Sequence, residues 1–322
     1  MSLRLGAAVA TALLSTTALA ACGSEGTGGS GGSGGSGSKG GQVDVIASFY
    51  PLQFAIQQIG GSHVNVSSLT KPGVEPHDLE LTPKDVAKVS DAKLFVFEKG
   101  ISGAVDQTAK NQASKTSYDV GPAAHLDLKL TSPVAEAHST EGEHEDEAGA
   151  TDPHFWLDPV RYQSVGNAIA AQLSKVDPEH KADYDAGAKA FGGKLNTLSG
   201  DLTTGLKSCS RKDVVTSHAA FGYLAARTGL TQVPIAGLSP ESEPEGSQLA
   251  SIATYAKAHH VTTIYTETLV SPAFADTVAK STGATTAVLD PIEGVTDKSA
   301  GKDYFEIMRS NLAALKKGQG CS

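Results

Sequence analysis

The sequence predicts an α/β protein of two lobes, each a mainly parallel sheet flanked by helices, joined by one long rigid backbone helix. Strand-like and helix-like segments alternate in both halves of the chain, which favours parallel sheets covered by helices. Between the halves, apolar residues recur in steps of three and four over about eight turns, a pattern typical of one amphipathic helix. About 280 residues follow the first forty, enough for two lobes of ordinary domain size.

The N-terminal segment predicts export and lipid attachment. Arg4 precedes an uncharged stretch at residues 5–19, which is too short to be a good membrane span. Small residues then lead to Cys22, so we expect residues 1–22 to be a lipoprotein signal peptide whose cysteine carries the lipid; an ordinary secretory signal is the alternative. Residues 23–42 are almost entirely Gly and Ser and predict a flexible tether. We therefore expect a body anchored on the extracytoplasmic face of the cell membrane.

The N-terminal lobe is expected over residues 43–176. Val43–Ala47 alternates apolar and polar residues, and a helix should begin at Pro51 and end at the glycine pair 60–61. A second short strand follows at 64–69. Thr82 and Pro83 have the residue types of an N-cap and a first helical position. The apolar run Leu94–Phe97 predicts a buried parallel strand.

The linker helix is expected over residues 177–208, beginning at Asp177-Pro178. Gly192 and Gly193 should each weaken it by about 1 kcal/mol. The C-terminal lobe, residues 209–322, repeats the strand–helix alternation. We expect its strands at 214–216, 261–265 and 287–289, and its helices at 219–227, 247–258, 272–282 and 304–315.

Charge and cysteine content limit the possible functions. The formal net charge of −9 argues against a nucleic-acid partner, which requires a basic face. With Cys22 lipidated, Cys209 and Cys321 are left in an exported chain, where a disulfide is the natural outcome and two free thiols the alternative. This bond would close a loop of more than a hundred residues and contribute about 4–5 kcal/mol. We expect the protein to be a monomer.

Three histidines and one aspartate stand out among the polar residues. His77 and His154 lie in turn-rich loops before the linker helix, whereas His218 and Asp290 directly follow predicted strands after it. Ligands of open parallel sheets bind outside the carboxyl ends of strands. Three imidazoles and a carboxylate form a plausible tetrahedral zinc site, and if these four converge the metal must lie between the lobes. We expect other histidines, such as His259, to be structural.

An ordered set of motifs resembles a known family over residues 43–311. The matching segments are FYPL at 49–52, GVEPHD at 73–78, DPHFWLDP at 152–159, TSHAAFGY at 216–223, GLSPESEP at 237–244 and LDP at 289–291. They resemble the cluster A-I solute-binding proteins of metal ABC importers, in particular the ZnuA-like zinc-binding proteins. The resemblance implies two α/β lobes with zinc, Zn(II), bound in the cleft as the transported ligand. It also implies an ABC permease and its ATPase as partners.

The same resemblance implies His77, His154 and His218 as ligands, with Asp290 fourth and Glu75 or Glu267 as substitutes. Manganese-binding members tend to carry a carboxylate where this chain has His218, so the third imidazole favours zinc. Because the resemblance is to solute-binding proteins, the protein is not expected to be an enzyme. The alternatives are a secreted zinc-dependent hydrolase with an open coordination position, a manganese binder, or an adhesin.

Residues 131–153 form an acidic segment with seven acidic side chains and two histidines, His138 and His144. Zinc-binding relatives often carry a His- and acid-rich loop at this place. The segment predicts either weak auxiliary metal capture or a solvated loop, and composition favours the solvated loop.

Overall fold

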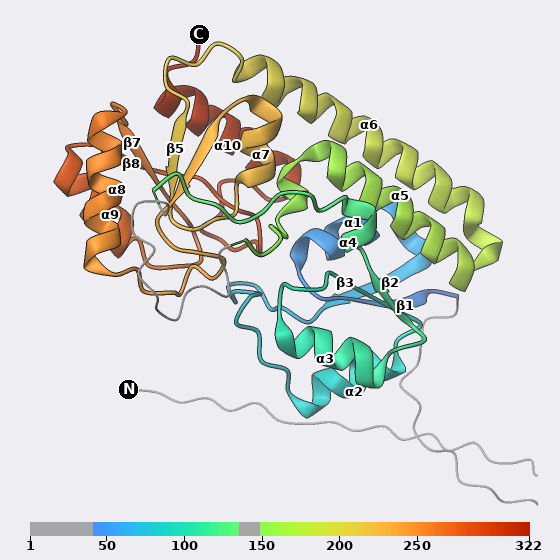
Figure 1. Ribbon diagram of the computed structural model, residues 1–322. Helices are drawn as coiled ribbons and strands as arrows, with labels where there is room; N and C mark the ends of the chain where they lie inside the picture. The colour runs from blue at the N-terminus through green and yellow to red at the C-terminus, as the bar shows by residue number, and fades with distance from the viewer. Residues whose placement is uncertain (1–40, 135–148) are drawn as a thin grey trace, which may run out of the picture. The chain divides into compact units, whose positions relative to one another are not determined.

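The computed structural model describes residues 41–134 and 149–322 (Figure 1). The predicted signal peptide, Cys22, nearly all of the tether, and His138 and His144 lie outside these residues. The described chain from residue 41 onward falls within one compact unit. It contains two four-stranded parallel sheets, with strand orders β2-β1-β3-β4 and β6-β5-β7-β8. None of the helices in these two ranges is long and apolar enough to cross a bilayer.

The first sheet is formed by β1 (Val43–Ala47), β2 (Val64–Ser68), β3 (Leu94–Phe97) and β4 (Ser117–Asp119). All four side chains of β3 are buried, because Leu94 and Val96 face one hydrophobic core while Phe95 and Phe97 face another. A run without polar alternation is what a strand covered on both faces requires.

The second sheet is formed by β5 (Asp213–Thr216), β6 (Thr231–Pro234), β7 (Thr263–Thr266) and β8 (Thr285–Val288). Its strands are parallel throughout. Consequently the carboxyl ends of all four strands lie at one edge of the sheet, and the loops that follow them are neighbours.

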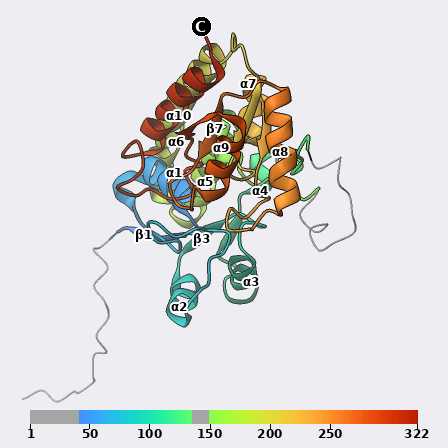
Figure 2. The ribbon, with the colours of Figure 1, turned by 90° about the vertical axis from the view of Figure 1, so that its left-hand side faces the viewer.

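The two sheets share one core between them. It combines side chains of β1, such as Val45, with side chains of the second lobe, such as Val214 and Leu289. The outer face of the first sheet is covered by α2 (Pro83–Asp91) and α3 (Gly103–Gln112). The outer face of the second is covered by α8 (Gly246–Ala258) and α9 (Ala273–Thr282), as Figures 1 and 2 show.

A layer of helices packs against the core that the two sheets share. It contains α1 (Tyr50–Gly60), α5 (Pro159–Val176), α6 (Lys181–Gly205), α7 (Gly222–Thr228) and α10 (Tyr304–Gln319). The predicted linker helix is confirmed as α6, which has 25 residues and follows a short 3₁₀ turn at Pro178–His180. A continuous core through this layer resists hinge motion, because close-packed interiors deform little.

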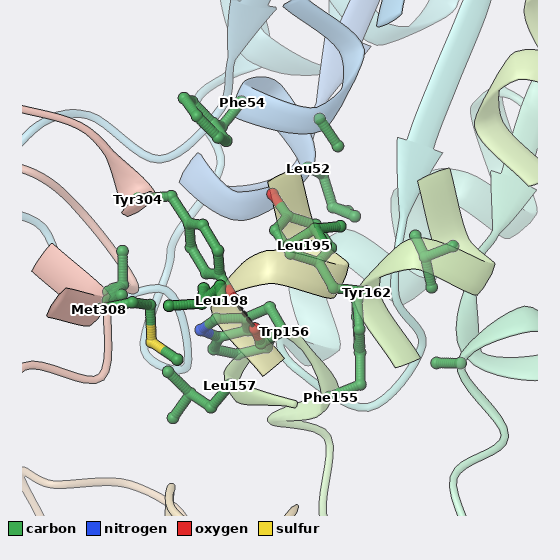
Figure 3. Packing of buried hydrophobic residues seen from close by; sticks show 14 of the residues in the cluster. Leu52, Phe54, Phe155, Trp156, Leu157, Tyr162, Leu195, Leu198, Tyr304 and Met308 are labelled. Atoms are coloured by element: carbon green, nitrogen blue, oxygen red, sulfur yellow. Dashed lines mark hydrogen bonds between the residues drawn. The ribbon is translucent and has the colours of Figure 1, made fainter. Parts of the chain in front are cut away.

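Aromatic residues fill the centre of this layer. Tyr162, Trp156 and Tyr304 are fully buried, and the Tyr304 hydroxyl donates to the backbone oxygen of Trp156 (Figure 3). Trp156 belongs to a short 3₁₀ turn, η3 (Phe155–Leu157), directly before α5. This contact joins α10, near the C-terminus, to a loop of the first half of the chain.

One glycine in α6 has a packing role. A Cβ at Gly187 would lie 2.3 Å from the backbone oxygen of Ile59 in α1, so α1 and α6 approach at backbone distance. Here the lower helix propensity of glycine is offset by a helix contact that no other residue permits.

Two strands that the sequence analysis did not anticipate are β4 and β6. Each is an outer strand of its sheet. β4 has three residues, none fully buried, and β6 contains Gln232 and ends in Pro234. Short, polar or proline-containing segments are tolerated at edges because one side of the strand needs no ladder hydrogen bonds. They therefore carry a weak sequence signal.

Glu98 follows β3 directly and is fully buried. Neither of its carboxyl oxygens has a hydrogen-bond partner among the described residues. Burial holds the pKa of Glu98 well above its ordinary value, and the charges of Asp119, Asp152 and Asp106 raise it further. The folded protein therefore holds a proton here that the unfolded chain releases above its ordinary glutamate pKa.

The variant Glu98→Gln is expected to gain stability relative to the parent protein as pH rises. Because the folded-state pKa of Glu98 is raised, its contribution to stability is fully present below the pKa of the unfolded chain. Above that pH, the contribution of Glu98 to the free energy of unfolding falls by about 1.4 kcal/mol per pH unit until the folded-state pKa is reached. Urea unfolding of metal-free protein between about pH 5 and 7 measures this difference. Glu179→Gln, at an exposed position, is the matched control. Parallel stability profiles for Glu98→Gln and the parent would contradict the prediction.

Candidate metal centre

Four side chains from loops in both halves of the chain converge: His77, His154, His218 and Glu293. Each offers a ligand atom, and these atoms all lie within 4.8 Å of one another. The Glu293 Oε1 atom is 3.5 Å from His77 Nε2, 3.3 Å from His154 Nε2 and 3.2 Å from His218 Nε2. Three ring nitrogens therefore surround one carboxylate oxygen at distances close to the edge of a zinc tetrahedron, which is about 3.3 Å for bonds of about 2.0–2.1 Å.

Each imidazole is oriented by a partner on its other nitrogen. The Nδ1 atoms of His154 and His218 are each 2.8 Å from a carboxylate, Asp152 Oδ1 and Glu267 Oε1 respectively. The Nδ1 atom of His77 is 3.2 Å from the backbone oxygen of Ile101. When Nδ1 donates its hydrogen to such an acceptor, the Nε2 lone pair faces inward and is available to a metal.

Local backbone turns present two of the histidines. His77 lies in the loop after β2, where its backbone N–H donates to Glu75 Oε1 at 2.8 Å. His154 stands before η3, where its N–H donates to Asp152 Oδ1 at 2.9 Å. In each case an acidic residue two positions upstream accepts the histidine's backbone N–H, and the bond to Asp152 is of the kind that short acidic side chains form in turns.

The second sheet supplies the other two ligand candidates. His218 lies two residues after the end of β5, and its backbone N–H donates to Glu267 Oε1 at 3.1 Å. Glu267 itself directly follows β7, and Glu293 lies in the loop after β8. Residues that follow β5, β7 and β8 therefore meet at one edge of this sheet, the edge at which ligands of parallel sheets bind.

Water is largely excluded from the cluster. His154 and His218 are fully buried, and the side chains of Glu293 and His77 are only 1% and 3% exposed. Although burial alone would raise the pKa of Glu293, the surrounding imidazoles, with His218 foremost, hold it well below its usual range. A carboxylate that stays ionised beside three imidazoles is a donor set suited to a borderline divalent cation.

The imidazoles respond differently to their surroundings. Burial lowers the pKa of His77. For His218 burial acts in the same direction, but the charges of Glu267 and Glu293 outweigh it and raise the pKa well above its ordinary value. The pKa of His154 is raised in the same way, by Asp152 and Glu293 against burial. A metal entering the cluster must therefore compete with protons.

Three of the four predicted metal ligands belong to the observed group, and the fourth does not. His77, His154 and His218 come together as expected, but Asp290, the expected fourth member, is not part of the group. Its carboxylate oxygens accept from the N–H of Ile292 at 2.8 Å and from the Thr268 hydroxyl at 3.2 Å. The fourth member is Glu293, three residues further on, which the sequence analysis missed. Asp290 was expected because it directly follows a predicted strand, whereas the turn at Pro291-Ile292 brings Glu293 inward.

The two substitutes considered for the fourth position lie beside the cluster. Glu267 orients His218 from the far side of its ring. Glu75 Oε1 is 3.9 Å from His77 Nε2, whereas its Oε2 atom has no hydrogen-bond partner among the described residues. Burial and the charge of Glu293 raise the pKa of Glu75 to about 10. Glu75 therefore adjoins the four-residue group as a neutral carboxyl group.

The predicted disulfide is present. Cys209 and Cys321 are bonded, at a sequence separation of 112. The bond ties the end of α10 to the segment before β5. The expected roles of Cys22, His138 and His144 fall outside the described residues and stay predictions.

Comparison with known proteins identifies relatives over most of the chain. Residues 45–318 match a family model described as "Zinc-uptake complex component A periplasmic". The high-affinity zinc uptake system protein ZnuA of Bacillus subtilis is 40% identical over 285 residues, which cover 85% of this chain and 87% of that protein. The zinc-binding lipoprotein AdcA of Streptococcus pneumoniae is 36% identical, but the match covers 86% of this chain and only 56% of AdcA.

Solved structures show the same architecture. The Zn(II)-bound ZnuA-like domain of S. pneumoniae AdcA superposes with a TM-score of 0.70 at 35% identity, covering 87% of this chain and 99% of the other. The laminin-binding protein Lmb of Streptococcus agalactiae, described as having adhesin and metal-transporting activity, gives 0.71 at 32% identity, covering 86% and 99%. By the extent of the family match and the identity to its relatives, this chain belongs to the ZnuA family of periplasmic zinc-uptake components.

Proposed function

We propose that this protein is the extracytoplasmic binding component of a metal ABC importer, which captures Zn(II) between its lobes and passes it to a permease. The observation that carries the proposal is the convergence of three inward-facing imidazole nitrogens and one carboxylate within 4.8 Å. His77 and His154 come from the first half of the chain, and His218 and Glu293 from the second. Membership of a family of zinc-uptake components supports the same reading.

The donor set favours zinc over manganese. Zinc prefers four ligands in a tetrahedron and binds imidazole nitrogen well, whereas manganese sites are richer in carboxylate, carbonyl and water oxygen. Here nitrogen donors outnumber the carboxylate by three to one. Because copper and nickel bind imidazole at least as strongly, selectivity in the cell also depends on which metals reach the protein.

The same donor set favours binding over catalysis. A catalytic zinc keeps one coordination position open for water or substrate. With Glu293 as the fourth donor, all four positions of a tetrahedron are supplied by the protein. Zinc is then the transported substrate, held until the protein docks on the permease.

Capture requires the imidazoles to be neutral, so each bound zinc displaces the protons that they hold. The partners on Nδ1, such as Asp152 and Glu267, keep the rings aimed inward before and after binding. The core shared by both sheets favours small loop rearrangements over wide opening of the lobes.

The remaining parts of the proposal concern export and anchoring, the lobe boundaries and the partners. We propose residues 1–22 as a lipoprotein signal, lipid on Cys22 and a Gly/Ser tether to residue 42. We also propose lobes at 43–176 and 209–322 joined by residues 177–208. An ABC permease and its ATPase are the proposed partners of the monomeric protein. The named pneumococcal relative is a lipoprotein, which supports this arrangement.

A metal-competition titration tests the function. We expect the purified, chelator-treated protein to bind one Zn(II) with a dissociation constant on the order of nanomolar, and zinc to displace bound manganese. Isothermal calorimetry with a competing chelator measures both. If manganese displaces zinc, the protein belongs to a manganese importer instead. If the protein does not bind zinc tightly, the proposed function is refuted.

A further inference from the structure

The loop that carries Glu293 has an unusual backbone. Ile292, directly before it, has a φ of 60°, in the left-handed region where β-branched residues are rarely found. A conformation of this kind persists only where the surrounding structure enforces it, and such residues cluster at functional sites. Ile292 is fully buried, so its neighbours must hold the turn.

Asp290 is the residue that closes this turn. Its Oδ1 accepts the N–H of Ile292 at 2.8 Å, and its Oδ2 accepts the hydroxyl of Thr268 at 3.2 Å. Asp290 is 2% exposed, so its carboxylate is shielded from bulk solvent, and it is not a member of the four-residue group. The side chain therefore holds the backbone of the residue next to Glu293, and hydrogen bonds with Thr268 and Ser299 fix the carboxylate in place.

Two further side chains hold the backbone of the same turn. Asn311 of α10 accepts the N–H of Asp290 at 2.9 Å and donates to its backbone oxygen at 2.7 Å. The indole of Trp156 donates to the backbone oxygen of Pro291 at 2.7 Å. Trp156 lies two residues after His154, so the turn that carries Glu293 is also tied to the loop that carries another ligand candidate.

We propose that Asp290 is a positioning residue that sets zinc affinity through Glu293 and is not itself a ligand. It holds the left-handed turn at Ile292, and this turn aims Glu293 Oε1 at the three imidazoles. This inference rests on the proposed function, because zinc affinity is its main readout. It reverses the role expected from the sequence, in which Asp290 binds the metal directly.

The two roles make opposite predictions for a conservative change. Asp290→Asn keeps Oδ1 as an acceptor for Ile292 N–H but removes the negative charge. A direct ligand would lose affinity in this variant as Glu293→Gln does, whereas a positioning residue should retain zinc affinity to within about threefold. Asp290→Ala removes the acceptor and should weaken zinc binding about 10- to 100-fold, the range typical of residues that orient metal ligands.

A double-mutant cycle provides the second test. If Asp290 acts through Glu293, adding Asp290→Ala to Glu293→Gln should change zinc affinity by less than about threefold, because coupled residues are not additive. The control is Asp303→Ala. Asp303 also accepts a backbone N–H, from Glu306 at the start of α10, and its loss should lower stability but leave zinc affinity unchanged.

The measurements are chelator-competition zinc titrations and the emission of Trp156, the chain's one tryptophan, in metal-free protein. We expect the emission of Asp290→Asn to match the parent and that of Asp290→Ala to shift. The inference is overturned if Asp290→Asn loses as much zinc affinity as Glu293→Gln. It is also overturned if Asp290→Ala has an equal effect in the parent protein and in Glu293→Gln.

A parent protein that binds no zinc refutes the proposed function instead. In that case unchanged emission in Asp290→Ala refutes the role in holding the turn. If Asp290→Ala does not fold, Asp290→Asn alone decides between the two roles.

Discussion

His154→Ala is expected to weaken zinc binding by about 10²-fold or more. Tight zinc sites are stabilised by roughly 10–16 kcal/mol, so one of four ligands accounts for a few kcal/mol. The effect should be near its maximum here because His154 is fully buried and its Nε2 is 3.3 Å from both His77 Nε2 and Glu293 Oε1. Zinc titration against a competing chelator measures the loss, and His77→Ala and His218→Ala should behave alike.

The matched control for this series is His259→Ala. His259 has the same local chemistry as His154, with its Nδ1 atom 3.0 Å from a carboxylate of Asp213. However, it lies just after α8 and stacks on Tyr255, outside the candidate metal centre. Its removal should leave zinc affinity unchanged. An equal loss in His259→Ala would show that zinc binds the chain's histidines without using a defined site.

Removal of the Cys209–Cys321 disulfide is expected to produce the largest loss of stability. The bond joins two residues at a sequence separation of 112, and cross-linking positions this far apart restricts the unfolded chain by about 4–5 kcal/mol. The Cys209→Ser, Cys321→Ser double variant should therefore unfold at a clearly lower urea concentration. Its zinc affinity should remain unchanged, because the bond lies at the end of α10 and contacts none of the four ligand candidates.

Reduction provides the internal control for this prediction. The parent protein in reductant should unfold at the midpoint of the serine variant, whereas the variant should not respond to reductant. Several contacts hold the end of α10 independently of the bond, including the Gln319 side-chain amide, which donates to the backbone oxygen of Asp213 at 2.9 Å. An unchanged midpoint in the serine variant would mean that residual structure already restricts the unfolded chain.

Elements with strong local signals were predictable from the sequence. Thr82 caps α2 with Pro83 at its first position, and the reciprocal bonds between Thr82 and Asp85 form a capping box. β3 has the predicted bounds, because four consecutive apolar residues suit only a strand covered on both faces. The linker helix followed from its apolar periodicity. What these elements share is a signal contained within one or two turns of chain.

The three histidine ligand candidates were also predictable, although by a different route. Each stands in a loop whose residues match a known family in order, and His218 follows a strand, where ligands of parallel sheets bind. In the structure these three imidazoles come together with Glu293 in one group that could hold a metal ion. The group contains Glu293 in place of the predicted Asp290. These two acids belong to one short loop, and no rule of spacing decides which of them turns inward.

The sequence by itself determined the order of strands and helices, the long helix between two α/β halves, and the residue types able to bind a transition metal. Only the tertiary structure decided which acid completes the group and which acids hold the histidines. Secondary structure depends on contacts a few residues apart, whereas the direction of the Glu293 side chain depends on Ile292, which is held in a left-handed turn by Asp290. Asn311 and Trp156, which hold that turn from 21 and 135 residues away, are beyond the reach of local sequence patterns.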